Sequence, residues 1–247
     1  MIKVCCFSGG KDSTAMLIHL LESNQQVDEV LYVSMGSWMW DGHLEHIRQV
    51  EDTLGVEITV LDVEDEIIKG FQRWGFPSWL NRWCTGIKRE SMRKFLHTKY
   101  SKSLERERER ESIVQYIGYT VDEVRRTSKK LYSSYDVEYP LVEANITSED
   151  ALAICKGYGF HFNGVYEHHE HYNCWLCPLQ KRGELEYLYN NEPSLWDKLR
   201  KMQQSTDGYY QDGMSIFDFD KRFWLKQQET LKQERMRARK KYNKKKK

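Results

Sequence analysis

The stretch Ser8-Gly9-Gly10-Lys11-Asp12-Ser13 follows directly on the apolar run Ile2–Phe7 and precedes a segment with helical periodicity. The apolar run predicts a buried strand, and the glycines predict a tight turn into a helix that we expect over Thr14–Glu22. A strand that turns into a helix in this way favours phosphate binding, because free N–H groups and the helix dipole stabilise an anion. Lys11 adds a mobile positive charge to this turn.

The spacing of the six residues is not that of the Walker loop, which has four residues between its first glycine and its Gly-Lys pair. The stretch resembles the PP-loop of the ATP pyrophosphatases, which split ATP into AMP and pyrophosphate. The resemblance implies that Ser8, Gly9, Gly10, Lys11, Asp12 and Ser13 bind a nucleotide. A tight turn without a ligand is the alternative. Asp12 and Ser13 are also the expected N-caps of the helix.

Composition limits the class of protein. The 247 residues are 40% apolar and 30% charged, which suits one sizeable α/β domain with an appendage. No apolar run is long enough to span a membrane, so we expect no membrane association. The sequence begins with a strand rather than a signal peptide, so we expect a cytoplasmic protein. In that compartment the six cysteines favour metal binding or catalysis over disulfides.

The net charge of +1 hides an asymmetry. Residues 231–247 sum to +9, so the rest of the chain sums to about −8. A basic tail of this kind predicts binding to nucleic acid through release of counterions. The alternative is a solvated helix end.

Strand and helix patterns alternate along the chain, which predicts a doubly wound parallel sheet with ligands at the carboxyl ends of its strands. The expected strands are Lys3–Phe7, Glu29–Ser34, Glu57–Asp62, Ile113–Gly118 and Val137–Leu141. Residues 64–82 read as irregular, and Lys102–Glu111 reads as an exposed helix or loop. The chain turns helical after Leu179, with a last helix expected over Phe217–Lys241.

Three further stretches narrow the class. They are Ile117–Arg126, the Tyr139–Val142 and Ile146–Ala151 pair, and Trp83–Lys88 taken with Cys174–Pro178. Together with the PP-loop they resemble the phosphoadenosine phosphosulfate reductase family over about residues 1–190. The resemblance implies a five-stranded sheet like that of the adenine nucleotide alpha-hydrolases. It also implies a nucleotide-binding domain at 1–190 and a helical extension at 191–247.

The same resemblance assigns roles to side chains. Lys11, Asp12 and Arg126 are the candidate catalytic residues, and Gly118 and Lys88 join the loop in binding nucleotide. Arg126 and Lys88 suit phosphate or a charged acceptor. ATP and Mg²⁺ are the expected ligands, and Asp12 or Asp122 would hold the magnesium ion on pyrophosphate oxygens.

Cys174 and Cys177 form a Cys-x-x-Cys pair, which is a moderate metal signal. Adenylyl-sulfate reductases of the family hold a [4Fe–4S] cluster with such a pair and a distant Cys-Cys, and here Cys84 follows Trp83 where they have the first cysteine. The resemblance implies a cluster on Cys84, Cys174 and Cys177, with one iron left open. A zinc site completed by His171 stays an alternative, as do three unrelated thiols. Cys5, Cys6 and Cys155 are expected in the core.

These features predict an ATP-dependent, AMP-forming enzyme that adenylates an acceptor for sulfur transfer to a nucleic acid. A sulfonucleotide reductase is the first alternative, although no cysteine follows Cys177 where such reductases carry their catalytic thiol. The second alternative is a nucleotide-binding protein with a structural zinc ion and little turnover. A sulfur-donor protein and a second copy of the chain are the further candidate partners.

Overall fold

The computed structural model describes residues 1–104, 113–128, 135–172 and 174–245. These residues divide into two compact units, each made of two segments of the chain. The first unit comprises Met1–Ile68 and Trp83–Trp175, and the second comprises Lys69–Arg82 and Leu176–Lys247. The domain boundary expected at residue 190 stays a prediction. In the structure, residues 176–190 belong to the same compact unit as the C-terminal helices.

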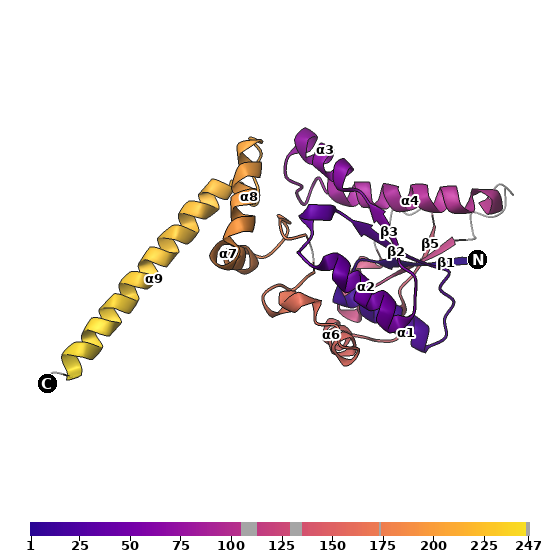
Figure 1. Cartoon of the computed structure of the whole chain (residues 1–247), viewed down its shortest axis with the longest axis horizontal. Coiled ribbons are helices and arrows are strands. Elements are labelled where there is room, and N and C mark those ends of the chain that lie inside the picture. Colours follow the sequence, from indigo (N-terminus) through magenta and orange to yellow (C-terminus); the bar gives the residue numbers. More distant parts are fainter. Residues whose placement is uncertain (105–112, 129–134, 173, 246–247) are drawn as a thin grey trace. The chain divides into compact units, whose positions relative to one another are not determined.

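A five-stranded sheet forms the centre of the first unit (Figure 1). Its strand order is β3-β2-β1-β4-β5, and every neighbouring pair is parallel. The strands are β1 (Ile2–Phe7), β2 (Glu29–Ser34), β3 (Thr59–Asp62), β4 (Ile113–Ile117) and β5 (Asp136–Glu138). The predicted doubly wound α/β fold is therefore confirmed.

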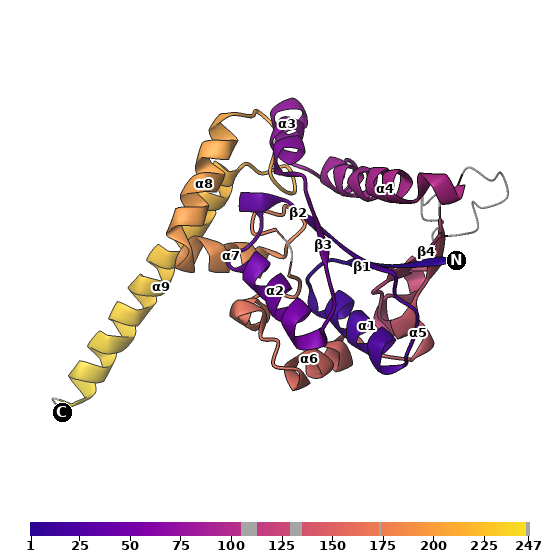
Figure 2. The ribbon, with the colours of Figure 1, turned by 45° about the vertical axis from the view of Figure 1, so that its right-hand side comes forward.

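Helices cover both faces of this sheet, as Figure 2 shows. The larger core cluster joins β1 to α1 (Lys11–Glu22), α2 (His43–Leu54) and α6 (Ser148–Gly157) on one face. A smaller cluster packs Val4 and Leu31 against α4 (Trp83–Leu104) on the other. Alternate β1 side chains thus enter opposite cores, as the period of two in a strand requires.

Short elements complete the first unit, and three helices dominate the second. The former are η1 (Gly36–Trp38), η3 (Val121–Arg126), α5 (Pro140–Glu143) and η4 (Phe162–Glu167); the latter are α7 (Arg182–Asn191), α8 (Pro193–Gln204) and α9 (Ile216–Lys245). Trp196, Phe219 and Phe223 pack between the helices of the second unit. None of the helices in the described part of the chain is long and apolar enough to cross a membrane.

Three local predictions were wrong. Residues 64–82 are not all irregular, because α3 occupies Glu64–Trp74 and the backbone N–H of Glu64 donates to Asp62 Oδ1 at 2.8 Å. The fifth strand ends at Glu138, since Pro140 begins α5. Helix α1 begins at Lys11 with Gly10 as its N-cap, so Asp12 and Ser13 lie inside the helix. Most of Lys102–Glu111 lies outside the described residues.

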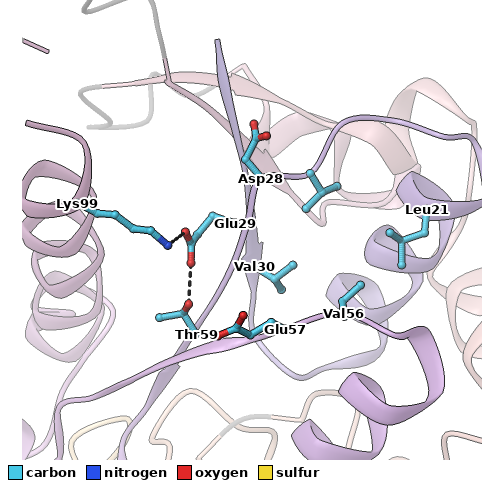
Figure 3. A pocket seen from close by; sticks show the side chains of 9 residues that line it. Leu21, Asp28, Glu29, Val30, Val56, Glu57, Thr59 and Lys99 are labelled. Carbon is cyan, nitrogen blue, oxygen red and sulfur yellow. Dashed lines mark hydrogen bonds and ion pairs between the residues drawn. The ribbon is translucent and has the colours of Figure 1, made fainter. Parts of the chain in front are cut away.

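A cavity of about 250 Å³ lies at the amino end of the sheet, between β2, β3 and α4 (Figure 3). The buried Glu29 carboxylate lines it and accepts hydrogen bonds from Lys99 Nζ at 2.5 Å, Thr59 Oγ1 at 2.6 Å and Tyr100 Oη at 3.0 Å. Burial favours a higher pKa for Glu29, but these hydrogen bonds outweigh it and lower the pKa below its ordinary value.

Candidate functional site

The strand order places the site. The chain leaves β1 for β2 on one side, while β4 lies against β1 on the other, so the connections diverge between β1 and β4. In an open parallel sheet, the crevice outside the carboxyl ends of two such strands is where ligands bind. Residues 8–13 follow β1 there, and residues 118–126 follow β4.

The loop after β1 is held in shape by its own serines. The backbone N–H of Ser8 donates to Ser13 Oγ at 3.1 Å, the two Oγ atoms lie 2.9 Å apart, and Ser13 Oγ donates to the Gly10 carbonyl at 2.9 Å. Gly9 has a φ of 77°, which L residues with side chains rarely adopt. These bonds pre-form the turn at the start of α1, where the helix dipole favours an anion.

Lys11 is buried at this turn, with a relative exposure of 7%. Its ammonium group lies 2.7 Å from Asp12 Oδ1 and donates to Ser148 Oγ at the start of α6. Its backbone N–H donates to Tyr166 Oη at 2.8 Å. A buried ammonium needs such partners because desolvation penalises an isolated charge.

The Asp12 carboxylate lies among both signs of charge. The pKa of Asp12 is raised above its ordinary value, mainly by burial, and the hydrogen bond and charge of Lys11 partly offset that rise. The charge of Glu123 also raises the pKa of Asp12, and that of His171 lowers it. His171, expected as a metal ligand, is exposed.

Gly118 allows the loop after β4 to pack on the loop after β1. A Cβ at this position would lie 3.0 Å from both the Asp12 carbonyl oxygen and Ser13 Cα. Any side chain would therefore push the two loops apart. Gly118 lies at the expected site, and its role is close backbone approach.

Asp122 and Ser148 tie η3 to α6. The backbone N–H of Ser148 donates to Asp122 Oδ2 at 2.6 Å, and Thr147 and Asp150 form a capping box on the same helix. A chain of contacts therefore runs from Asp122 through Ser148 and Lys11 to Asp12.

Arg126 is exposed at the end of η3. Its guanidinium pairs with Glu123, and its Cζ lies 4.1 Å from the centre of the Tyr119 ring, which stacks on Tyr139 with 5.6 Å between centroids. The side chain is thus held over an aromatic surface. Lys88 is half-buried in the first turns of α4.

The three candidate metal-binding cysteines are half-buried. Cys84 lies in the first turn of α4, Cys174 makes an isolated antiparallel bridge with Met39, and Cys177 belongs to the second unit. Across the ranges that the structure describes, no group of three or more His, Cys, Asp or Glu side chains is placed to hold a metal ion. The metal centre therefore stays a prediction, and we route no chemistry through it.

Cys5 and Cys155 are buried in the core, as predicted, whereas Cys6 is half-buried. Burial raises the pKa of Cys155 to about 12, which keeps its thiol protonated and unreactive at neutral pH. Two site residues escaped the sequence reasoning. Ser148 follows Thr147, the N-cap of a capping box that predicts only a helix start, and Tyr166 carried no signal.

Part of the chain is similar to known proteins. Residues 3–112 match the family model of the phosphoadenosine phosphosulfate reductase domain. The N-terminal part of the chain is therefore similar to this domain.

An uncharacterized protein of Methanocaldococcus jannaschii is 25% identical over 207 residues, which are 78% of this chain and 39% of that protein. The chain thus spans about two fifths of the length of the curated relative it matches.

Two solved structures are also similar. One is an NH3-dependent NAD synthetase from Campylobacter jejuni, with 13% identity, 83% of this chain and 82% of that chain covered, and a TM-score of 0.42. The other is the U34-tRNA thiolase NcsA from Methanococcus maripaludis with its [4Fe–4S] cluster, with 16% identity, 82% and 71% covered, and a TM-score of 0.41. Because both scores are below 0.5, neither likeness carries an argument about this chain.

Proposed function

We propose that this protein is an ATP-dependent, AMP-forming enzyme that adenylates an acceptor and releases pyrophosphate. The observation that carries the proposal is the buried ammonium of Lys11, which lies at the pre-formed loop after β1 and is oriented by Asp12 and Ser148. A cation fixed at a helix N-terminus, in the crevice where the connections diverge, suits an anionic phosphate chain.

The expected reaction is attack of an acceptor oxygen on the α-phosphorus of ATP. The bond from that phosphorus to the α,β-bridging oxygen breaks, and the electron pair leaves on pyrophosphate. Lys11 and the loop N–H groups would stabilise the charge that develops on this leaving group. Mg²⁺ would neutralise further phosphate charge when bound, and Asp12 or Asp122 would contact it.

Sulfur transfer to a nucleic acid is the purpose we propose for the adenylation. An adenylated oxygen is a good leaving group, and a sulfur nucleophile from a donor protein would displace AMP from it. The basic C-terminal turns of α9 support a polyanionic substrate, because Arg235, Arg237, Arg239, Lys240 and Lys241 are all exposed. Such binding should weaken steeply as salt concentration rises.

Substitution of Lys11 tests the reaction. We expect Lys11→Ala to slow pyrophosphate release at least about 100-fold, the usual scale for losing one stabilising group at a developing charge. Lys156→Ala, which removes an exposed lysine from α6, is the matched control and should retain full activity. Normal ATP cleavage by folded Lys11→Ala protein would disprove the loop assignment.

A sulfonucleotide reductase is the second candidate, and the family match to the phosphoadenosine phosphosulfate reductase domain favours it. Such an enzyme would reduce the sulfonucleotide to sulfite with thioredoxin as the electron donor. Anaerobic assays that follow sulfite and pyrophosphate separately distinguish the two activities. A nucleotide-binding protein with structural zinc would bind ATP and release neither product.

The metal centre is proposed on the resemblance alone, with a [4Fe–4S] cluster favoured over zinc. Anaerobically purified protein should contain iron and sulfide, and Cys174→Ala combined with Cys177→Ala should lose both. A measured content of one zinc ion per chain would instead indicate a zinc site completed by His171. Unchanged metal content in the double variant would reject the three-cysteine site.

A further inference from the structure

The segment 69–82 of the second unit exposes large apolar side chains beside positive charge. The relative exposure is 47% for Trp74, 74% for Trp79 and 101% for Leu80. Lys69, Arg73 and Arg82 give the segment a charge of +3, and it contains no acidic residue. Exposed apolar groups that cluster in this way mark an interaction surface.

The segment is anchored, so these side chains are held in solvent by the fold. Phe76 is buried at its centre and packs edge-to-face on Phe71 and Tyr210, with ring centroids 5.1 Å and 5.0 Å away. Beyond it, the backbone N–H of Ser78 donates to the Asn81 carbonyl at 3.1 Å, and the N–H of Asn81 donates to Ser78 Oγ at 3.1 Å. A fixed turn therefore presents Trp79 and Leu80.

Each exposed indole carries a guanidinium. Arg73 Cζ lies 5.0 Å from the ring centre of Trp74, and Arg82 Cζ lies 5.9 Å from that of Trp79. Both arginines are themselves exposed. An apolar protein partner would not require this pairing, whereas unpaired bases stack on indoles while arginines bind the phosphates between them.

We propose that residues 73–82, which we call the tryptophan loop, bind single-stranded nucleic acid by stacking unpaired bases on Trp74 and Trp79. This inference deepens the proposed function and rests on it for the identity of the acceptor. Under this proposal the tryptophan loop recognises the unpaired strand, and the basic C-terminal turns of α9 are a separate surface. Stacking accepts any base, so the loop selects strandedness rather than sequence.

The test uses the full chain and a single-stranded oligonucleotide of about 12 nucleotides, within the usual size of a stacking site. Binding should quench tryptophan fluorescence. Trp79→Ala and Trp74→Ala should each weaken binding about fivefold or more and reduce the quenching, as loss of one stacked base implies. Trp224→Ala is the matched control, since Trp224 is 53% exposed on α9, and it should bind like the wild type.

A duplex of the same sequence supplies the second arm. Its binding should be equal in wild type and Trp79→Ala, because paired bases cannot stack on the loop. Equal affinity of wild type, Trp74→Ala and Trp79→Ala for the single strand would overturn the proposal. A second result would also overturn it. In that result the wild type does not bind the oligonucleotide, and Trp79→Ala instead loses binding to a protein partner or to anionic vesicles.

Pyrophosphate release separates this proposal from the proposed function. If wild type releases pyrophosphate but the tryptophan variants bind the oligonucleotide normally, only the loop proposal fails. If the oligonucleotide binds through the loop but no pyrophosphate is released, the proposed reaction fails and the binding surface stands.

Discussion

Each end of the parallel sheet buries a charged side chain, and the two side chains have different partners. At the amino end, Glu29 accepts hydrogen bonds from Lys99, Thr59 and Tyr100 (Figure 3). At the carboxyl end, Lys11 contacts Asp12 and Ser148 at the N-termini of α1 and α6. Both groups are buried and partnered, so burial alone does not identify the functional one.

Placement separates them. The donors around Glu29 offset its charge, and its pKa is lowered, which is the sign of a satisfied carboxylate. Lys11 lies where the positive end of a helix dipole adds to its own charge, in the crevice where the connections diverge. We expect the ion pair at the amino end to stabilise the fold, and under the proposed function we expect the pair at the carboxyl end to exchange partners with an anion.

Gly118→Ala should break the carboxyl end most strongly. The added Cβ would lie 3.0 Å from backbone atoms of Asp12 and Ser13, which cannot rotate away. We expect the free energy of unfolding to fall by about 1–3 kcal/mol, as in other overpacked sites. Pyrophosphate release should fall more than about tenfold, because small displacements of reacting groups have large kinetic costs.

Gly183→Ala in α7 is the control for that substitution. No atom lies within 4 Å of a Cβ at Gly183, so alanine should stabilise the protein by up to about 1 kcal/mol through helix propensity. Chemical denaturation and pyrophosphate assays on both variants make the comparison. Equal activity of the two would show that close packing at Gly118 does not position the loop.

Ser148→Ala should have a smaller effect, because the Lys11 ammonium keeps its contacts with Asp12 and with the Tyr166 ring, whose centre lies 5.8 Å away. Ser148 acts through Lys11, so it is a positioning residue. We expect kcat for pyrophosphate release to fall about tenfold with KM for ATP changed less, and Ser148→Thr to restore it. A variant as active as wild type, or failure of threonine to rescue, would show that Ser148 does not orient the ammonium.

The fold followed from local pattern, because β1, β2 and β4 are short, mainly apolar runs and β2 has the predicted bounds. Helix α3 was missed although Glu64, Asp65 and Glu66 in its first turn are typical of a helix start. The aromatic residues after Trp74 favoured an irregular structure, and the prediction extended it over the whole of residues 64–82.

The site was predictable only in part. The loop residues are adjacent in sequence, so their spacing carries the chemistry. Of the partners of Lys11, Asp12 is adjacent in sequence, but Ser148 lies 137 residues away and Tyr166 lies 155 residues away. Only the packing of α6 and η4 against α1 brings them to the loop, and no local spacing constrains such long-range partners.

Glu29→Gln tests the amino end and should leave catalysis unchanged. Because folding lowers the pKa of Glu29, its ionised form stabilises the native state above the pKa of the unfolded chain, and this contribution is lost as pH falls through the folded pKa. We expect the variant to be about 1 kcal/mol less stable at pH 7, the scale of one charged hydrogen bond.

The pH dependence is the sharper measurement. From about pH 5 downward the wild type should lose stability more steeply than Glu29→Gln, so the two unfolding curves should converge in acid. Lys99→Met, which removes the main donor while leaving Glu29 buried, should be less stable at pH 7 than Glu29→Gln, because an unpaired buried carboxylate costs more than a neutral amide. Parallel curves at every pH would place the stabilisation in packing rather than charge. A fall in pyrophosphate release by Glu29→Gln would erase the distinction between the two ends, since the amino-end pair would then serve the reaction as well as the fold.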